Sequence, residues 1–207
     1  MSVYGRIFAA MYDRLMAGTE KAGLSDRRQA LLAQAQGRVL EVGAGTGVNI
    51  QHYPVAVEEI VFTEPEEPMA QRLEAKLAAA GRRGSVVRAP AEQLPFEDGS
   101  FDTVVSTLVL CTVSDPVKAL AEIERVLRPG GTLLFLEHVR ADDPGLARWQ
   151  DRLAPAWRRF GHGCNPNRPT PDLIRRTGFG SVDLEEGQLP KAPPIVRPLV
   201  TGRARTH

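Results

Sequence analysis

The most constraining feature of the sequence is a glycine-spaced turn that directly follows an apolar run. Residues 39–47 read VLEVGAGTG, and Glu64 stands at the end of the next apolar run. Glycine at alternate positions lets a small molecule lie against bare backbone. A carboxylate at the tip of the following strand can accept hydrogen bonds from both hydroxyls of a ribose. The pattern predicts a nucleoside site built from Gly43, Gly45, Gly47 and Glu64.

The spacing of the glycines indicates which nucleoside this is. A dinucleotide-binding turn reads G-x-G-x-x-G, and Val48 stands where its third glycine belongs. The departure favours S-adenosylmethionine, which has a ribose but no pyrophosphate to place at a helix N-terminus. A glycine turn by itself is equally typical of a tight turn that binds nothing, so the argument depends on Glu64.

Apolar runs alternate with helical periodicity, which is typical of parallel strands joined by helices. We expect strands at 38–42, 59–63, 85–88, 101–107 and 132–138, and helices at 67–80 and 116–127, the latter ended by Arg128-Pro129-Gly130-Gly131. Helices are expected at 149–160 and 172–177, and closing strands at 181–185 and 196–202. The predicted fold is α/β: a Rossmann-like, doubly wound sheet of seven strands, mostly parallel with an antiparallel last strand.

In such a sheet, ligands bind beyond the carboxyl ends of the strands. Glu41 lies near such an end, where it would orient the ammonium group of the cofactor or the glycine turn, and Thr107 ends the fourth strand. We expect one domain: a helical lid over 1–36, a cofactor-binding core over 37–140, and an acceptor-pocket segment with closing strands over 141–207. Tyr4, Phe8 and Tyr12 form a helical stripe that suits either a lid or plain packing.

Composition narrows the function classes. The 207 residues carry a formal net charge of +1 without a basic tract, which argues against a nucleic-acid binder. Two cysteines without C-x-x-C spacing suggest a reducing, cytoplasmic setting. The N-terminal segment is interrupted by charges and predicts neither a signal peptide nor a membrane span. Nothing in the sequence indicates an oligomeric state.

Two further motifs carry a family resemblance. The loop AEQLPF at 91–96 and the turn LRPGG at 127–131 resemble class I S-adenosylmethionine-dependent methyltransferases of the type 11 small-molecule group. The resemblance implies that Glu64 binds the ribose and that Ala91 and Glu92 frame the adenine ring; Tyr12 belongs to a Tyr-Asp pair common before this core. The family usually has an aspartate where this chain has Pro90, so recognition of the adenine amino group is expected to fall to backbone atoms.

The flanking segments suggest the acceptor. Residues 107–113 and 149–170 resemble the membrane-associated alkyl-thiol S-methyltransferases of the methyltransferase-like 7 type. That resemblance implies a small thiol as acceptor. The hydrophobic N-terminal anchor of that family is absent, so no stable membrane anchor is expected. An amine, phospholipid head group or quinone stays open as acceptor, as does a non-catalytic cofactor-binding protein, because one fold serves many functions.

Methylation of a thiol needs alignment and removal of a proton. His138 at the end of the fifth expected strand and His162 in a glycine-rich loop are the candidate bases. The expected pocket residues are Cys111, Trp157, Phe160 and Cys164. No metal site is expected, because no spacing among the cysteines and histidines is a recognised ligand pair.

Overall fold

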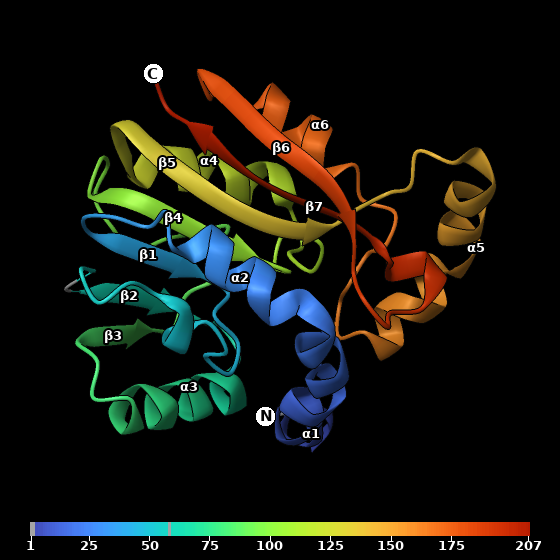
Figure 1. Cartoon of the computed structure of the whole chain (residues 1–207), viewed down its shortest axis with the longest axis horizontal. Coiled ribbons are helices and arrows are strands. Elements are labelled where there is room, and N and C mark those ends of the chain that lie inside the picture. The colour runs from blue at the N-terminus through green and yellow to red at the C-terminus, as the bar shows by residue number, and fades with distance from the viewer. Residues whose placement is uncertain (1–2, 58) are drawn as a thin grey trace.

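A computed structural model describes residues 3–57 and 59–207, with side chains from Ala9 onward. One seven-stranded sheet runs through the molecule (Figure 1). Its strands are β1 Val39–Val42, β2 Ile60–Thr63, β3 Gly84–Val87, β4 Phe101–Thr107, β5 Leu127–His138, β6 Ser181–Gln188 and β7 Pro198–Arg205. The helices are α1 Val3–Thr19, α2 Ser25–Leu32, α3 Glu67–Ala79, α4 Pro116–Val126, α5 Pro144–Phe160 and α6 Thr170–Arg176.

The strand order is β3-β2-β1-β4-β5-β7-β6. Strands β1 to β5 pair in parallel, whereas β7 is antiparallel to both β5 and β6. The predicted fold class is confirmed. The chain turns to one side of β1 for β2 and β3 and to the other for β4 and β5, so the ends of β1, β2 and β4 define the switch point where this class of sheet binds ligands.

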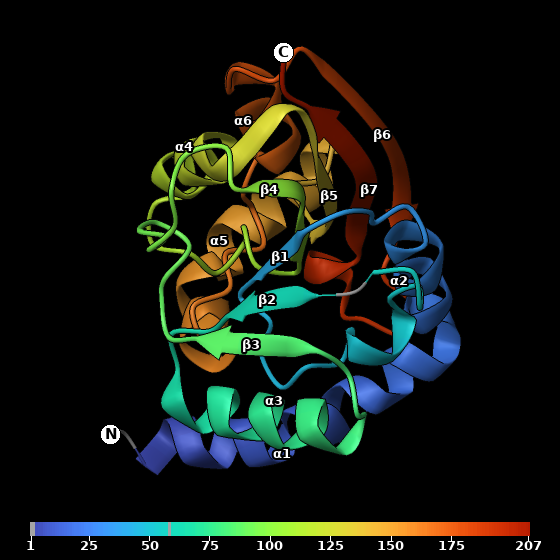
Figure 2. The ribbon, with the colours of Figure 1, turned by 90° about the vertical axis from the view of Figure 1, so that its left-hand side faces the viewer.

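Helices cover both faces of the sheet because its strands place apolar side chains on both sides. In β1, Val39 belongs to one core cluster, whereas Leu40 and Val42 belong to the other. Leucines of α2 and α3 pack into the first cluster, and apolar residues of α4 and α6 into the second. This alternation along each strand is what a doubly wound sheet requires. Figure 2 shows α3 and α1 below the β3 edge of the sheet.

The predicted start of the fifth strand was wrong. Strand β5 begins at Leu127, not at residue 132, because Leu127 already pairs with Phe101 before Thr132 pairs with Thr103. The four residues between them form an irregularity in the strand; Gly130 has φ 74°, which only glycine adopts easily. The LRPGG turn therefore lies within a strand and not ahead of it.

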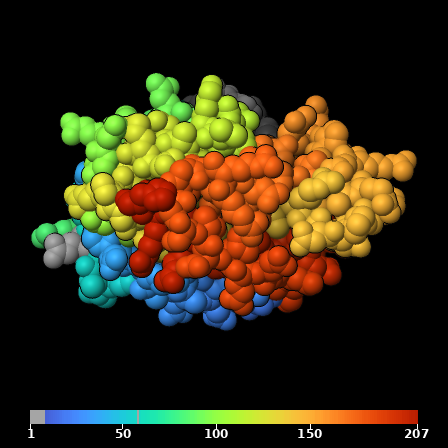
Figure 3. All heavy atoms as spheres, turned by 90° about the horizontal axis from the view of Figure 1, so that it is seen from above, coloured from blue at the N-terminus to red at the C-terminus, as the bar shows by residue number. Residues whose placement is uncertain are grey.

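Helix α5 begins five residues earlier than expected. Asp143 accepts a hydrogen bond from the Leu146 backbone N–H at 2.7 Å, and Pro144 occupies the first turn, where no N–H is needed. The helix continues through Pro155 to Phe160. In Figure 3 the segment 141–160 (amber) stands out at one end of the molecule. Helix α6 also begins earlier than predicted, at Thr170, and Pro171 lies in its first turn.

The segment Glu20–Leu24 joins α1 to α2, and the chain kinks there at Gly23, whose φ of 122° is not helical. It lies against α3, where the Lys76 ammonium is 2.7 Å from the Asp13 carboxylate. None of the helices in the described part of the chain has the length and apolar character needed to cross a bilayer.

Candidate functional site

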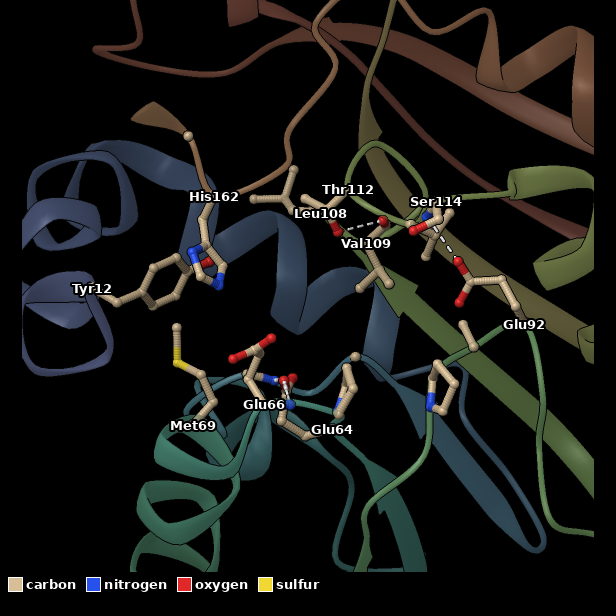
Figure 4. Close-up of a pocket in the computed structure, with 17 residues that line it drawn as sticks. Tyr12, Glu64, Glu66, Met69, Glu92, Leu108, Val109, Thr112, Ser114 and His162 are labelled. Atoms are coloured by element: carbon tan, nitrogen blue, oxygen red, sulfur yellow. Dashed lines mark hydrogen bonds between the residues drawn. The ribbon is translucent and has the colours of Figure 1, made fainter. Parts of the chain in front are cut away.

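A cavity of about 400 Å³ opens at the carboxyl ends of β1, β2 and β4 (Figure 4). Most of the predicted cofactor residues line it: Tyr12, Gly43, Gly45, Glu64, Ala91 and Glu92, together with His162. In the close-up, Tyr12 and His162 are drawn at one end of the cavity and Glu92 at the other. We call this space the cofactor cavity. Leu108 and Val109 also line it, so the structure brings together residues from six separate segments of the chain.

The glycine turn forms one wall of the cofactor cavity. Gly43, Gly45 and Gly47 have φ of 58°, 57° and 79°, in the left-handed region that glycine tolerates best. A Cβ on Gly43 would lie 2.6 Å from Val109, and one on Gly47 would lie 2.7 Å from Leu73. A Cβ on Gly45 would meet nothing within 4 Å. Gly43 and Gly47 are therefore needed for packing, whereas Gly45 leaves free space for a ligand against the backbone.

Glu64 holds the turn and faces the same space. Its carboxylate accepts hydrogen bonds from the Gly45 N–H at 2.8 Å and from the Glu66 N–H at 2.9 Å. Burial raises the pKa of Glu64, and these two N–H groups partly offset the effect. Each carboxylate oxygen accepts one of these bonds and retains lone-pair capacity toward the cavity. The residue predicted to bind ribose hydroxyls is thus fixed in position.

Glu92 orders the opposite wall. Its carboxylate accepts hydrogen bonds from the Ser114 N–H at 2.7 Å and the Asp115 N–H at 3.2 Å. Ala91 is buried and lines the cavity beside Pro90. The loop that the family resemblance implies for the adenine ring therefore lies at the cavity, and Glu92 ties it to the segment after β4.

The lining of the cofactor cavity does not include three of the predicted cofactor residues: Glu41, Gly47 and Thr107. The buried Glu41 carboxylate accepts hydrogen bonds from Asn49 at 3.0 Å and from the Tyr53 hydroxyl at 2.6 Å, and Thr107 accepts one from Asn49 at 2.9 Å. Burial raises the pKa of Glu41 to about 7 despite these bonds. Of the two roles expected for Glu41, the contacts support orientation of the glycine turn, because its partner Asn49 lies two residues after Gly47.

Arg28 completes this buried network and was missed in the sequence. Its guanidinium donates to Asn49 at 3.0 Å, to Thr107 at 2.8 Å and to Glu20 at 3.1 Å. A fully buried cation is costly unless it is paired in this way. One signal was available: Arg28 falls four residues after Leu24 and three before Leu31, on the buried stripe of the helix.

The N-terminal helix is fastened to the glycine turn. The Thr46 hydroxyl donates to the Asp13 carboxylate at 2.5 Å, and Lys76 donates to the other oxygen of Asp13. Burial raises the pKa of Asp13, but the bonds from Lys76 and Thr46 outweigh it and the net pKa is lowered. This contact places Tyr12 at the cofactor cavity, as a lid would. The side chains of Tyr4 and Phe8, which complete the predicted stripe, lie outside the described residues.

A second cavity of about 430 Å³ adjoins the first. We call it the acceptor cavity. Tyr12, Leu108, Thr112 and Gly161 line both cavities, so the two share a wall. Its described lining is largely apolar and holds no carboxylate. All four predicted pocket residues line it, Cys111, Trp157, Phe160 and Cys164, and so does the predicted base His138. His162, the other predicted base, lines the cofactor cavity instead.

At the floor of the acceptor cavity, sulfur and imidazole groups meet. Cys164 Sγ lies 3.0 Å from His138 Nε2 and accepts a hydrogen bond of 3.0 Å from Trp157 Nε1. Both cysteines are free thiols. The interaction with Cys111 lowers the pKa of the Cys164 thiol, with His138 and Trp157 adding to the effect. The pKa of Cys111 is raised by the same interaction and by burial.

Three non-glycine residues adopt left-handed backbone among the described residues. Leu108, His162 and Lys191 have φ of 60°, 49° and 55°. Such a conformation is unfavourable for an L-residue and persists where the surrounding structure enforces it. Each of the three lines the cofactor cavity, the acceptor cavity or both. Strain in this protein is thus concentrated around the joined cavities.

Comparisons with known proteins agree with this geometry. A family model described as a methyltransferase domain matches residues 40–135. The thiol S-methyltransferase TMT1A of Homo sapiens is 34% identical over 202 residues, covering 95% of this chain and 82% of that protein. The thiol S-methyltransferase TMT1B of Homo sapiens is 38% identical over 180 residues, covering 84% and 73%. A crystal structure from Thermotoga maritima, described as a SAM-dependent methyltransferase and possible histamine N-methyltransferase, superimposes with a TM-score of 0.72 at 25% identity and covers 98% of both chains.

The cofactor of this family fits the residues present. The open space over Gly45 admits a ligand against bare backbone, and the fixed Glu64 carboxylate offers acceptor capacity beside it. Ala91 and Glu92 complete the opposite wall. Together with the matches above, these features establish that the chain belongs to the class I S-adenosylmethionine-dependent methyltransferases, within the family of the thiol S-methyltransferases, and is an enzyme that uses S-adenosylmethionine to methylate a small molecule.

Proposed function

We propose that the enzyme methylates the sulfur of a small apolar thiol. The observation that carries the proposal is the acceptor cavity: an apolar space that shares a wall with the cofactor cavity and has Cys111, His138 and Cys164 at its floor. The similarity to proteins named thiol S-methyltransferases, over 95% of this chain in one case, supports the same substrate class.

S-Adenosylmethionine supplies a methyl group on a sulfonium; the lone pair of the acceptor forms the new bond to carbon, and the electrons of the old bond stay on the departing sulfur. The protein contributes alignment. Leu108 and Thr112 line both cavities, so a molecule bound in one cavity lies next to a molecule bound in the other. An anionic thiolate that approaches a cation loses charge on reaction, and a dry apolar pocket favours that step.

The lining also discriminates among acceptors. A protonated amine or a phospholipid ethanolamine group would need a carboxylate partner when taken out of water. No Asp or Glu stands among the described residues of the acceptor cavity, where Lys191 contributes the charge that is present. A cationic acceptor is therefore disfavoured, whereas an uncharged alkyl or aryl thiol finds apolar walls in Met16, Leu189 and Val196.

A quinone is the second candidate. The C-methyltransferase UbiE of Marinomonas sp. is 36% identical over 127 residues, and that match covers 57% of this chain. The demethylmenaquinone methyltransferase of Clavibacter sepedonicus is 31% identical over 197 residues, and that match covers 84% of this chain. The match to the thiol S-methyltransferase TMT1A has a higher identity, 34%, and covers 95% of this chain, so the similarity supports the thiol more strongly.

The test is methyl transfer from isotopically labelled S-adenosylmethionine to matched acceptors: hexanethiol, hexanol, hexylamine, thiophenol, phenol and a quinol. We expect label in the thiols alone. Transfer confined to the amine, the phenol or the quinol would overturn the proposal.

A cytoplasmic location is also proposed, because two cysteines that lie close together without a disulfide suit a reducing compartment. Cell fractionation with antibody detection tests this location.

A further inference from the structure

Three side chains of types that can bind metal ions, Cys111, His138 and Cys164, lie together in the lining of the acceptor cavity. Cys111 follows β4, His138 ends β5, and Cys164 lies in the loop after α5. Their ligand atoms all lie within 4.8 Å of one another, and all three residues are buried. Spacing along the chain had given no hint of this group, since the members are separated by 26 residues or more.

The distances between the ligand atoms of Cys111, His138 and Cys164 suit a tetrahedral zinc ion. Zinc binds cysteine sulfur at about 2.3 Å and histidine nitrogen at about 2.0–2.1 Å. Ligand atoms around such an ion stand about 3.5–3.8 Å apart. Cys164 Sγ and His138 Nε2 are 3.0 Å apart and would open slightly to admit the ion. Movements of about 1 Å would bring the whole set to the required separations.

The fourth coordination position would face the acceptor cavity. Cys111, His138 and Cys164 all line that cavity, whose described lining is largely apolar. Three protein ligands with an open position distinguish a catalytic zinc site from a structural one, which is closed by four. Two cysteines and one histidine form one of the known catalytic ligand sets.

The surroundings hold this set in place. Glu137 accepts hydrogen bonds from the backbone N–H groups of Val109 and Leu110, which fixes the loop that carries Cys111. The N–H and side-chain amide of Asn165 both donate to the Cys111 carbonyl, at 2.8 and 3.1 Å, and so join the loop of Cys164 to that of Cys111. Trp157 Nε1 donates to Cys164 Sγ, and donors of this kind orient ligands in metal sites.

We propose that Cys111, His138 and Cys164 bind Zn²⁺ and that the thiol acceptor occupies its fourth position. This inference rests on the proposed function, because it names how the thiol is bound and activated. On binding, the S–H bond of the acceptor breaks, a Zn–S bond forms with the sulfur lone pair, and the proton leaves to solvent through the cavity mouth. A thiol bound to zinc is deprotonated. His138 is then a ligand in place of the base that the sequence suggested.

The chain offers a direct spectroscopic test. Cys111 and Cys164 are its two cysteines, so a thiolate-to-metal absorption band can only come from this cluster. Protein purified without a histidine tag, in a phosphine reductant, would be loaded with Co²⁺. We expect one cobalt per chain, a near-ultraviolet charge-transfer band, and visible bands typical of four-coordinate cobalt. Adding hexanethiol should shift the visible bands, and hexanol should not.

The variants Cys111→Ser, Cys164→Ser and His138→Gln should each weaken cobalt binding at least tenfold. Since none of the three residues lines the cofactor cavity, each variant should keep its affinity for S-adenosylmethionine, which shows that it is folded. His207→Gln is the matched control: an exposed histidine outside the cluster, whose loss should change nothing.

Two results separate this inference from the proposed function. Absence of the charge-transfer band, with thiol methylation unchanged by a chelator, would overturn the zinc site and leave the thiol substrate standing. A cobalt site that forms in the wild type but does not respond to hexanethiol, in protein that methylates no thiol, would overturn thiol binding at the metal and the proposed substrate together. We expect zinc removal to slow thiol methylation at least tenfold and zinc addition to restore it.

Discussion

The Glu64 carboxylate lies 2.8 Å from the backbone nitrogen of Gly45, so the acid after β2 and the centre of the glycine turn after β1 are joined by a hydrogen bond. This bond fixes, relative to each other, the two features that we expect to bind the cofactor. A buried acceptor held by backbone donors is pre-organised, which lowers the entropy cost of binding.

Replacing Glu64 should therefore weaken cofactor binding. Each hydrogen bond to a charged group contributes about 1.5–3 kcal/mol. We expect Glu64→Ala to raise the Kd for S-adenosylmethionine at least tenfold in isothermal titration calorimetry. Glu74→Gln, an exposed acid on α3, is the control and should bind normally. Equal affinity in the two variants would show that Glu64 does not bind the ribose.

The role of Gly45 in cofactor binding can be tested by comparison with Gly81, a glycine of similar backbone conformation. Gly45 and Gly81 have φ of 57° and 60°, and an added Cβ would meet nothing within 4 Å at either. Alanine should cost about 1–2 kcal/mol of stability at each position through the left-handed conformation. Gly45→Ala should also lose affinity for S-adenosylmethionine tenfold or more, because Gly45 lines the cofactor cavity and Gly81 does not. Calorimetric binding with thermal melting measures both effects.

The contact of Asp13 with Thr46 and Lys76 should control how long the cofactor stays bound. The pair with Lys76 is half exposed, so Asp13→Asn should change the free energy of unfolding by less than about 1 kcal/mol. We expect the dissociation rate of S-adenosylmethionine, measured by stopped-flow fluorescence, to rise several-fold. Arg14→Gln, an exposed change on the same helix, should leave the rate as it is.

Glu41 should make stability depend on pH. Its pKa is about 7 in the folded chain and about 4.5 when exposed. Between these values the folded state keeps a proton that the unfolded state has lost, so the free energy of unfolding falls as pH rises from about 4.5 to 7. The fall amounts to about 3 kcal/mol. Urea unfolding at pH 5 and pH 8 should show about 2.5 kcal/mol of this fall, because part of it is complete at pH 5, and Glu41→Gln should reduce the difference by that amount.

Two exposed aromatic residues on α5 separate acceptor binding from general surface effects. Phe160 is 73% exposed and lines the acceptor cavity, whereas Trp149 is 57% exposed and lines neither cavity. We expect Phe160→Ala to raise the KM for hexanethiol about fivefold, from about 1 kcal/mol of lost apolar contact. Trp149→Ala should leave KM unchanged. An identical KM in both variants would place the acceptor elsewhere.

Much of the fold follows from local pattern. The apolar runs that became β1, β2 and β4 lie within a residue of their predicted positions, because a strand buried on both faces needs an unbroken apolar stretch. The start of β5 was not predictable, since the pairing of Leu127 with Phe101 is a long-range contact that skips an irregular turn. Local sequence records periodicity, not the partner across the sheet.

The sequence by itself determined the cofactor side: a glycine turn and an acid at the ends of adjacent strands converge wherever a parallel sheet forms, and their spacing is local. Only the tertiary structure decided the acceptor side. Cys111, His138 and Cys164 come from three segments whose approach depends on the packing of α5 and the loops after β4 and β5. The burial of Arg28 among Glu20, Asn49 and Thr107 also depends on the assembled core. The core removes the guanidinium from water, and a cation without water needs such hydrogen-bond partners.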